Sequence, residues 1–327
     1  MRLWPKKKGE QMRRVILWKS KLIFLFFILM LWSFGGCAGG KWGYIDTSDR
    51  MVIQRHFDDA TPFIEGLAAV KIGNLWGYID KAGKTVIEPK FEGAWTFHEG
   101  LAAVMSGGKW GYIDKAGKST IQPQFEDAAP FSDGLAPVEV SGKWGYIDNT
   151  GKLVIQRQFD YAWRFSEGLA AVKKGGKWGF IEKTGQIAID PQFDGVLPFS
   201  DGLAGVLIGS NRGFIDRAGQ IVIKPQFDNV LSFSDGLAPV KIGTKWGYID
   251  REGKIAIQPQ FERAFSFSEE LAPVKIDYKW GYIFKTGQIA IRPQYDGAFP
   301  FHEGLAIVKV GIATGYVDKT GRYLRIL

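Results

Sequence analysis

The chain has 327 residues, with 42 Lys or Arg against 34 Asp or Glu, so its formal net charge is +8. Residues 1–36 hold eight of the basic residues and one of the acidic residues, which leaves 34 basic and 33 acidic residues in the rest of the chain. A protein that binds DNA or RNA normally carries a basic face. The near-neutral remainder therefore argues against a nucleic-acid partner.

The first 36 residues have the pattern of an export signal. A basic segment at 1–21 precedes the apolar run Leu22–Trp32, whose 11 residues are short for a membrane-spanning helix. Phe34-Gly35-Gly36-Cys37 resembles the lipobox of bacterial lipoproteins, although leucine is more usual where Phe34 stands. Cys37 is the only cysteine and can form no internal disulfide. An uncleaved anchor with an incidental cysteine is the alternative, and Met12 is a second possible start.

This pattern predicts a signal peptide at 1–36 and a lipidated N-terminus at 37–40. The resemblance to lipoproteins implies an acyl group such as palmitate on Cys37. We therefore expect an exported protein, held to a bacterial membrane by this lipid and facing the periplasm or the cell exterior.

Residues 41–327 form repeats with a constant period of 34, as eight full units and a truncated ninth. The hexapeptide KWGYID stands at Lys41–Asp46, Lys109–Asp114, Lys143–Asp148 and Lys245–Asp250. Two positions define the unit. Its Trp is present at Trp42, Trp76, Trp110, Trp144, Trp178, Trp246 and Trp280. Its Gly is present at Gly43, Gly77, Gly111, Gly145, Gly179, Gly213, Gly247, Gly281 and Gly315.

Each unit has the local chemistry of β-structure. The runs LAxVK, KWGYID and xVIxP are separated by turns with Gly, which predicts a three-stranded antiparallel meander. Recurrent Gly and Pro exclude the helical repeats that share a period of 34. Propeller blades normally hold four strands in about 40–45 residues. We therefore expect an all-β fold in which the units stack as an open or superhelical array, with a closed propeller-like ring as the alternative.

Certain positions keep their character in every copy and predict the core between stacked units. Leu, Ala and Val recur in LAxV, and Ile recurs in the strand that follows KWGYID. Two aromatic rings six residues apart recur in the long connection, as in Phe57 and Phe63, and we expect them to be buried. The Gly after the Trp predicts close approach of a neighbouring backbone or of an aromatic ring, such as a Trp stacked from unit to unit.

These units resemble the WG repeat, also called the KWG repeat, of bacterial exported and surface proteins. The resemblance covers residues 41–327 and implies a β-repeat scaffold with few assigned roles. Arg212 and Thr314 replace the Trp, and Glu270 replaces a Gly. We expect the alkyl stem of Arg212 to cover what a Trp would cover, and polar Thr314 to suit an end unit.

Nothing in the sequence predicts an enzyme. The three histidines share no constellation, and the motifs of hydrolases, zinc proteases and phosphate-binding loops are absent. Asp160 and Glu167 recur as a pair of acids in every unit, whereas acid–base catalysis needs two unequal environments. We interpret these acids as hydrogen-bond acceptors for backbone N–H groups in turns. No cofactor or metal is predicted; structural calcium is the alternative, because acids and loop carbonyls suit a hard cation, but no EF-hand spacing is present.

The remaining expectation is binding, and the most variable bulky position lies midway along the connection. It is occupied by Thr61, Trp95, Ala129, Trp163, Leu197, Leu231, Phe265 and Phe299. The candidate ligand-binding residues are Trp95, Trp163, Arg212, Phe265 and Phe299. The predicted function is a non-enzymatic, envelope-anchored scaffold that binds another protein. The alternatives are stacking of envelope polysaccharide or peptidoglycan on these rings, rings that merely cover the neighbouring unit, and a spacer without a ligand.

Overall fold

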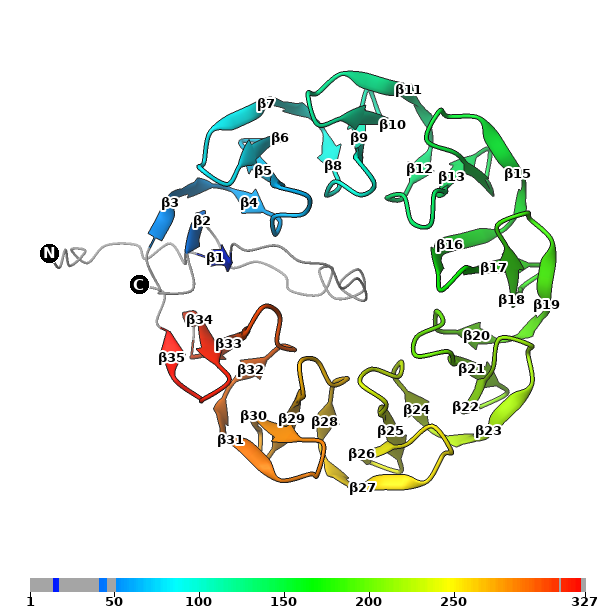
Figure 1. The fold of residues 1–327 in the computed structure, drawn as a ribbon, viewed down its shortest axis with the longest axis vertical. Helices are drawn as coiled ribbons and strands as arrows, with labels where there is room; N and C mark the ends of the chain where they lie inside the picture. The colour runs from blue at the N-terminus through cyan, green and yellow to red at the C-terminus, as the bar shows by residue number, and fades with distance from the viewer. Residues whose placement is uncertain (1–13, 18–40, 46–50, 312, 325–327) are drawn as a thin grey trace, which may run out of the picture.

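The structure is a computed structural model that describes residues 14–17, 41–45, 51–311 and 313–324 (Figure 1). Every regular element in this part of the chain is a β-strand. Cys37 and all of the predicted signal segment except 14–17 lie outside the described residues, so the boundaries at 36 and 40 stay predictions.

One blade shows how the sequence forms these strands. Alternating apolar residues form β5 (Leu67–Ile72) and β6 (Leu75–Asp80), and a tight turn with Gly73 joins them. A second turn leads into β7 (Thr85–Phe91), and all neighbouring strands are antiparallel. The predicted meander of LAxVK, KWGYID and xVIxP is therefore confirmed.

A fourth strand, which the sequence did not reveal, completes the sheets of blades 2 to 9. The connection after the outer strand supplies it: β4 (Asp59–Ala60) is two residues long and pairs with β5. The predicted absence of a helix in this connection is confirmed, and the prediction of three strands is wrong. Two residues are too few to show alternation in a sequence, which is why this strand was missed.

The remaining strands repeat this order. The third to fifth sheets contain β8 (Gly93–Ala94), β9 (Leu101–Ser106), β10 (Lys109–Asp114), β11 (Ser119–Phe125), β12 (Asp127–Ala128), β13 (Ala136–Val140), β14 (Lys143–Ile147), β15 (Leu153–Phe159), β16 (Tyr161–Ser166), β17 (Leu169–Lys174), β18 (Lys177–Glu182) and β19 (Ile187–Phe193). The sixth and seventh contain β20 (Gly195–Val196), β21 (Ala204–Ile208), β22 (Asn211–Ile215), β23 (Ile221–Phe227), β24 (Asn229–Val230), β25 (Ala238–Ile242), β26 (Lys245–Ile249) and β27 (Ile255–Phe261). The last two contain β28 (Arg263–Ala264), β29 (Leu271–Ile276), β30 (Lys279–Phe284), β31 (Ile289–Tyr295), β32 (Gly297–Ala298), β33 (Leu305–Val310), β34 (Ala313–Asp318) and β35 (Tyr323–Leu324).

The sheets form a ring of nine blades, with the short strands innermost and strands such as β7 outermost (Figure 1). The expected open array is therefore wrong, and the alternative of a closed, propeller-like ring is confirmed. The fourth strand provides the physical reason, because it gives blades 2 to 9 the usual four-stranded propeller sheet. Each 34-residue unit supplies the outer strands of one blade and the inner strands of the next, so successive blades share a unit.

Blade 1 differs from the others. It consists of β1 (Arg14–Leu17), β2 (Trp42–Ile45) and β3 (Met51–Phe57), and β1 pairs with β2 in parallel. Blade 9 is built wholly from the C-terminal end and finishes with a two-residue strand. The two ends of the chain therefore do not share a blade.

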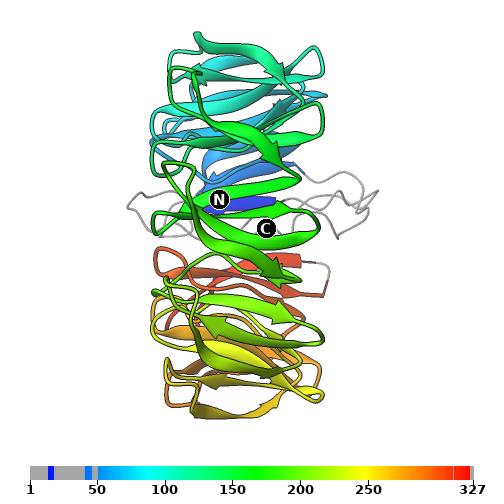
Figure 2. The ribbon, with the colours of Figure 1, turned by 90° about the vertical axis from the view of Figure 1, so that its right-hand side faces the viewer.

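The strands run across the thickness of the ring, so their ends define two faces (Figure 2). One face carries the turns that precede the Lys-Trp pairs and their equivalents, such as 107–108, and we call it the Lys-Trp face. The opposite face carries the turns with Glu-Gly or Asp-Gly, such as 65–66, and we call it the Glu-Gly face.

The Gly after each Trp is required by the neighbouring strand of the same blade. At Gly77, a Cβ atom would lie 2.5 Å from the carbonyl oxygen of Ile87 and 2.6 Å from the backbone nitrogen of Pro89. The pairing of β6 with β7 shifts register here, and Pro suits such a bulge because it has no N–H to leave unpaired. Close approach of backbone is confirmed, and the aromatic ladder proposed as its cause is not.

The core lies between blades, as eight clusters that each join two successive blades. Phe57 and Phe63, as predicted, are buried at 1% and 7% exposed. The Tyr of KWGYID is also buried, and its hydroxyl donates to a backbone carbonyl of the next blade, as from Tyr112 to Ala129 at 2.8 Å. A buried hydrogen bond and a packed ring thus fix the angle between neighbours.

Candidate functional site

The recurrent acids accept hydrogen bonds from backbone N–H groups, and the first and second acids of the pairs lie on opposite faces. On the Lys-Trp face, Asp194 accepts hydrogen bonds from Lys177 Nζ of the blade behind and from the N–H of Gly209 in the blade ahead. On the Glu-Gly face, Glu167 accepts from the N–H of Gly202 in the next blade. The predicted turn chemistry is confirmed, but these bonds link blades. The hydrogen bond from Lys177 is the main cause that lowers the pKa of Asp194.

The three histidines lie in separate places. His56 and His302 are exposed, whereas His98 is 6% exposed. Thr96 Oγ1 lies 2.8 Å from His98 Nε2. Burial, with a contribution from the Arg164 guanidinium, lowers the pKa of His98 to about 4. A neutral, buried imidazole at this position is a packing residue.

We expect the stability of the protein to fall as the pH drops from about 6.5 to 4, by up to about 3 kcal/mol from His98 alone. In this pH window His98 is protonated in the unfolded chain but stays neutral in the folded protein, so protonation favours unfolding. Urea unfolding at several pH values measures the effect. His98→Ser, which installs the residue of most other units, should flatten this pH dependence, and exposed His302→Ser should not. Equal pH profiles for wild type and His98→Ser would contradict the assignment.

Three of the candidate rings pack on the recurrent Trp of their own blade. The ring centroids of Trp163 and Trp178 lie 5.4 Å apart, those of Phe265 and Trp280 lie 5.3 Å apart, and those of Trp95 and Trp110 lie 6.3 Å apart. All three variable rings are half-buried. They therefore cover the Trp and still present an edge to solvent.

The other two candidate ligand-binding residues are Phe299 and Arg212. Phe299 is half-buried, and its carbonyl accepts the hydroxyl of Tyr282. Arg212 is half-buried between Leu207 and Phe227, as expected for a stem that replaces a Trp. Its Nε is buried without a partner in the described part of the chain.

Blade 5 holds an aromatic site. A hollow of about 520 Å³ is lined by Asp160, Tyr161, Trp163, Lys173, Gly176 and Trp178. Its position beside the turn at Gly176 places it on the Lys-Trp face, toward the inner edge of the ring. Tyr161 is 43% exposed, so one wall of the hollow is a ring open to solvent. We call this hollow the blade 5 cleft.

The backbone of β16 creates this cleft. Whereas the innermost strands of blades 2 to 4 and 6 to 9 have two residues, β16 has six, and its pairing with β17 shifts register between Ala162 and Phe165. A bulge re-aims side chains, and Trp163 lies in this one. Tyr161, Lys173 and Trp178 are direct cross-strand neighbours, so their side chains share one face of the sheet.

Of the two charged side chains that line the cleft, Asp160 is paired with a counter-charge and Lys173 is not, in the part of the chain that the structure describes. Asp160 is neutralised by Lys143, with a distance of 2.6 Å between Oδ1 and Nζ. Lys173 Nζ lies 6.0 Å from the Trp178 ring centroid and makes no ion pair within the described residues. Partial burial, then the carboxylates of Asp127 and Glu139, raise the pKa of Tyr161, so its hydroxyl stays protonated and can donate. Sequence reasoning found Trp163 but missed Tyr161 and Lys173, whose positions hold many residue types.

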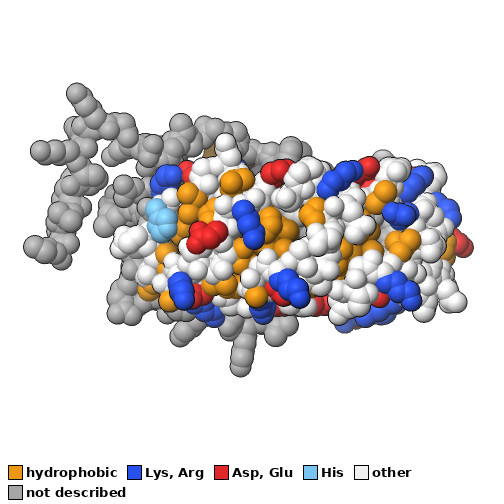
Figure 3. Space-filling model, turned by 90° about the horizontal axis from the view of Figure 1, so that it is seen from above, with side chains coloured by type: hydrophobic (Ala, Val, Ile, Leu, Met, Phe, Trp, Pro, Cys, Tyr) orange, Lys and Arg blue, Asp and Glu red, His pale blue; other side chains and the backbone are white. Residues whose placement is uncertain are grey.

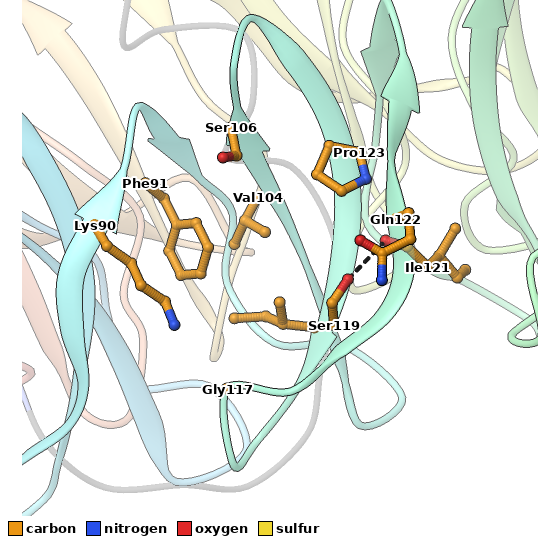
Figure 4. Close-up of a pocket in the computed structure, with 10 residues that line it drawn as sticks. Lys90, Phe91, Val104, Ser106, Gly117, Ser119, Ile121, Gln122 and Pro123 are labelled. Atoms are coloured by element: carbon orange, nitrogen blue, oxygen red, sulfur yellow. Dashed lines mark hydrogen bonds between the residues drawn. The ribbon is translucent and has the colours of Figure 1, made fainter.

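A smaller hollow of about 200 Å³ lies between blades 2 and 3 (Figure 4). Lys90 and Phe91 of β7 flank it on one side and Ser119–Pro123 of β11 on the other. Its apolar lining comes from ordinary core positions such as Val104 and Ile121, and Ser119 Oγ is 3.5 Å from the carbonyl oxygen of Ile121. No titratable cluster faces it, and it has no chemistry beyond packing.

Within the described residues, no three His, Cys, Asp or Glu side chains are placed to hold a metal ion. No helix in that part of the chain is long and apolar enough to cross a membrane.

Comparison with known families decides the class of the repeats. The family described as WG containing repeat matches residues 42–76, 76–110, 110–144, 144–178, 178–211, 213–246, 246–280 and 280–311. The chain belongs to the WG-repeat family. The junction between the fifth and sixth WG repeats omits Arg212, the position where Trp is replaced. A search of curated proteins gave no match.

Solved structures resemble this WG-repeat ring in fold. A eukaryotic initiation factor superposes with a TM-score of 0.58 at 10% identity, over 82% of this chain and 86% of that chain. Apo AztD from Citrobacter koseri gives a TM-score of 0.46 at 11% identity, over 79% and 92%. At such low identity the likeness of the initiation factor concerns the fold alone.

Proposed function

We propose that this WG-repeat protein is a non-enzymatic scaffold, anchored to the bacterial envelope through Cys37, that holds envelope polysaccharide on its Lys-Trp face. The blade 5 cleft carries the proposal. Sugar rings bind by laying their C–H faces on aromatic rings, and Tyr161, Trp163 and Trp178 offer such rings in one hollow. Lys173 and the Tyr161 hydroxyl supply polar groups at its edge.

Several features favour binding over catalysis. The recurrent acids already accept hydrogen bonds from Lys side chains or backbone N–H groups, as at Asp160 and Glu167. The buried histidine is neutral packing. The cleft instead combines apolar walls with a few polar groups, which is the usual composition of a ligand site.

A protein partner, the function expected from the sequence, remains a second candidate on a different surface. The outermost strands of blades 5 to 8 begin with Ile187, Ile221, Ile255 and Ile289, exposed by 44%, 50%, 37% and 52%. An exposed apolar belt on four successive blades suits a protein contact. Over blades 2 to 4 the rim mixes hydrophobic side chains with charged ones (Figure 3).

The test compares envelope material before and after protease digestion. We expect the intact chain, purified in detergent, to be retained by insoluble envelope polysaccharide that protease has freed of protein. Tyr161→Asn/Trp163→Leu should reduce retention at least about tenfold, the result of losing about 1.4 kcal/mol or more. Both substitutions install residues that other units carry at these positions, so the fold should persist.

The matched control is Trp95→Leu, which removes the same kind of ring from blade 3. It should leave retention unchanged, and thermal unfolding should show all variants folded. Retention that disappears when the envelope is digested would reject the polysaccharide and favour the protein partner.

A further inference from the structure

Blade 8 carries a second unusual surface on the Lys-Trp face. Its turn between β29 and β30 is formed by Asp277 and Tyr278, with φ angles of 45° and 65°. Two positive φ angles define the primed turn that suits a hairpin, and they favour Gly. The comparable turns have Gly107-Gly108, Ser141-Gly142 and Gly175-Gly176. Among the described turns of the Lys-Trp face with both angles positive, only this one has no Gly.

This turn presents a ring to solvent. Tyr278 is 81% exposed, the highest value among the large exposed hydrophobic residues of the described chain. Its backbone N–H donates to Glu262 Oε1 at 3.2 Å, which holds the turn in place. A bulky residue kept in a left-handed conformation costs conformational energy and gains nothing from burial here. Such strain is typical of functional positions.

The inner edge of the same blade carries two cations side by side. Arg263 and Lys275 are directly opposite across β28 and β29, and like charges at such a pair are unfavourable. Neither makes an ion pair within the described residues. The corresponding pairs in the other blades are Asp59 and Lys71, Gly93 and Met105, Asp127 and Glu139, Tyr161 and Lys173, Gly195 and Leu207, Asn229 and Lys241, and Gly297 and Lys309. Blade 8 alone has two cations.

The rings and the cations lie together. Lys275 Nζ is 5.9 Å from the centroid of the Tyr278 ring, and Lys275 is also the direct cross-strand neighbour of Trp280. Trp280 in turn is stacked on Phe265, with an interplanar angle of 17°. One surface therefore combines an exposed ring for stacking with two cations that form no ion pair within the described residues.

From this arrangement we propose that the turn and inner edge of blade 8 form an anion-recognising subsite for an acidic polysaccharide. The inference rests on the proposed polysaccharide function and specifies its ligand. Tyr278 stacks on a sugar or polyol unit, and Arg263 with Lys275 bind its carboxylate or phosphodiester group, the anions for which these side chains are suited. The bound anion removes the repulsion between the two cations.

Binding of the intact chain to three soluble polymers tests this: polygalacturonate, which carries carboxylates, polyglycerol phosphate, which carries phosphodiesters, and neutral galactan. We expect at least one anionic polymer to bind ten times or more tightly than galactan, with an affinity that falls as salt is added. Whichever anionic polymer binds more tightly identifies the source of the charge. Arg263→Gln/Lys275→Gln should abolish this preference, while Lys241→Gln in blade 7 should keep it.

Tyr278→Gly separates recognition from folding. Because Gly suits the turn, this variant should be at least as stable as the wild type and yet bind the anionic polymer at least about tenfold more weakly. Ser141→Gly, which relieves the same turn in blade 4, should leave binding unchanged.

Two outcomes would overturn the inference, and they differ in meaning. Equal binding of galactan and the anionic polymers, unaffected by the charge variants, would reject the anionic subsite and leave the polysaccharide function standing. If no polymer binds and protease-treated envelope also fails to retain the chain, the proposed function fails together with the inference.

Discussion

Gly111→Ala is expected to destabilise the protein by at least about 3 kcal/mol, because no space exists for a methyl group at this position. The new Cβ atom would lie 2.5 Å from the carbonyl oxygen of Ile121 and 2.7 Å from the backbone nitrogen of Pro123. Both are backbone atoms of β11, so rotation of a side chain cannot relieve the clash. The strands β10 and β11 must separate, and the bulge that turns the outer strand is lost.

Urea unfolding followed by circular dichroism measures this loss. Gly195→Ala is the control, because its Cβ atom would meet only the side chain of Leu207 at 3.5 Å, an ordinary contact, without a positive φ angle. It should change the free energy of unfolding by less than about 1 kcal/mol. Equal, small effects of the two substitutions would show that the recurrent Gly has another role.

Phe131→Ala is expected to cost about 3–5 kcal/mol, the usual range for removing a buried aromatic ring. Phe131 is 1% exposed and packs between blades 3 and 4, with its ring centroid 4.9 Å from that of Tyr112. Removing the side chain leaves a cavity in the single core cluster between blades 3 and 4. The contact between the two blades is therefore loosened. The measurement is the same urea titration.

Phe284→Ala provides the comparison for this prediction. Phe284 stands where other units have Asp or Glu, at the end of β30, and is 47% exposed. Its removal should change stability by less than about 0.5 kcal/mol. A loss below about 1 kcal/mol for Phe131→Ala would mean that the blades are not held together by the rings between them.

Much of the fold was predictable because its signals repeat. The period placed every turn, alternation identified the three longer strands, and constant character identified the buried rings at Phe159 and Phe165. Closure was not predictable, since it depends on β4 and its equivalents, which are too short to show a pattern. The sequence also could not show that the backbone opposite Gly77 belongs to the same blade.

The candidate site was predictable only in part. Variation among units pointed to Trp163 and Phe265, because a position that changes freely is not needed by the scaffold. Tyr161, Lys173 and Tyr278 were missed, because the role of each depends on its three-dimensional surroundings, which the sequence does not show. Tyr161 gains its place from the bulge in β16, and Tyr278 from the φ angles of its turn.

The most direct test of the central claim is to map which tryptophans polysaccharide shields. The intact chain would be oxidised with N-bromosuccinimide, with and without protease-treated envelope polysaccharide, and each tryptophan followed by mass spectrometry. We predict that Trp163 and Trp178 become protected, while Trp76 and Trp246, whose blades lack the cleft, oxidise as before. Protection that is absent, or spread evenly over all four, would contradict polysaccharide binding at blade 5.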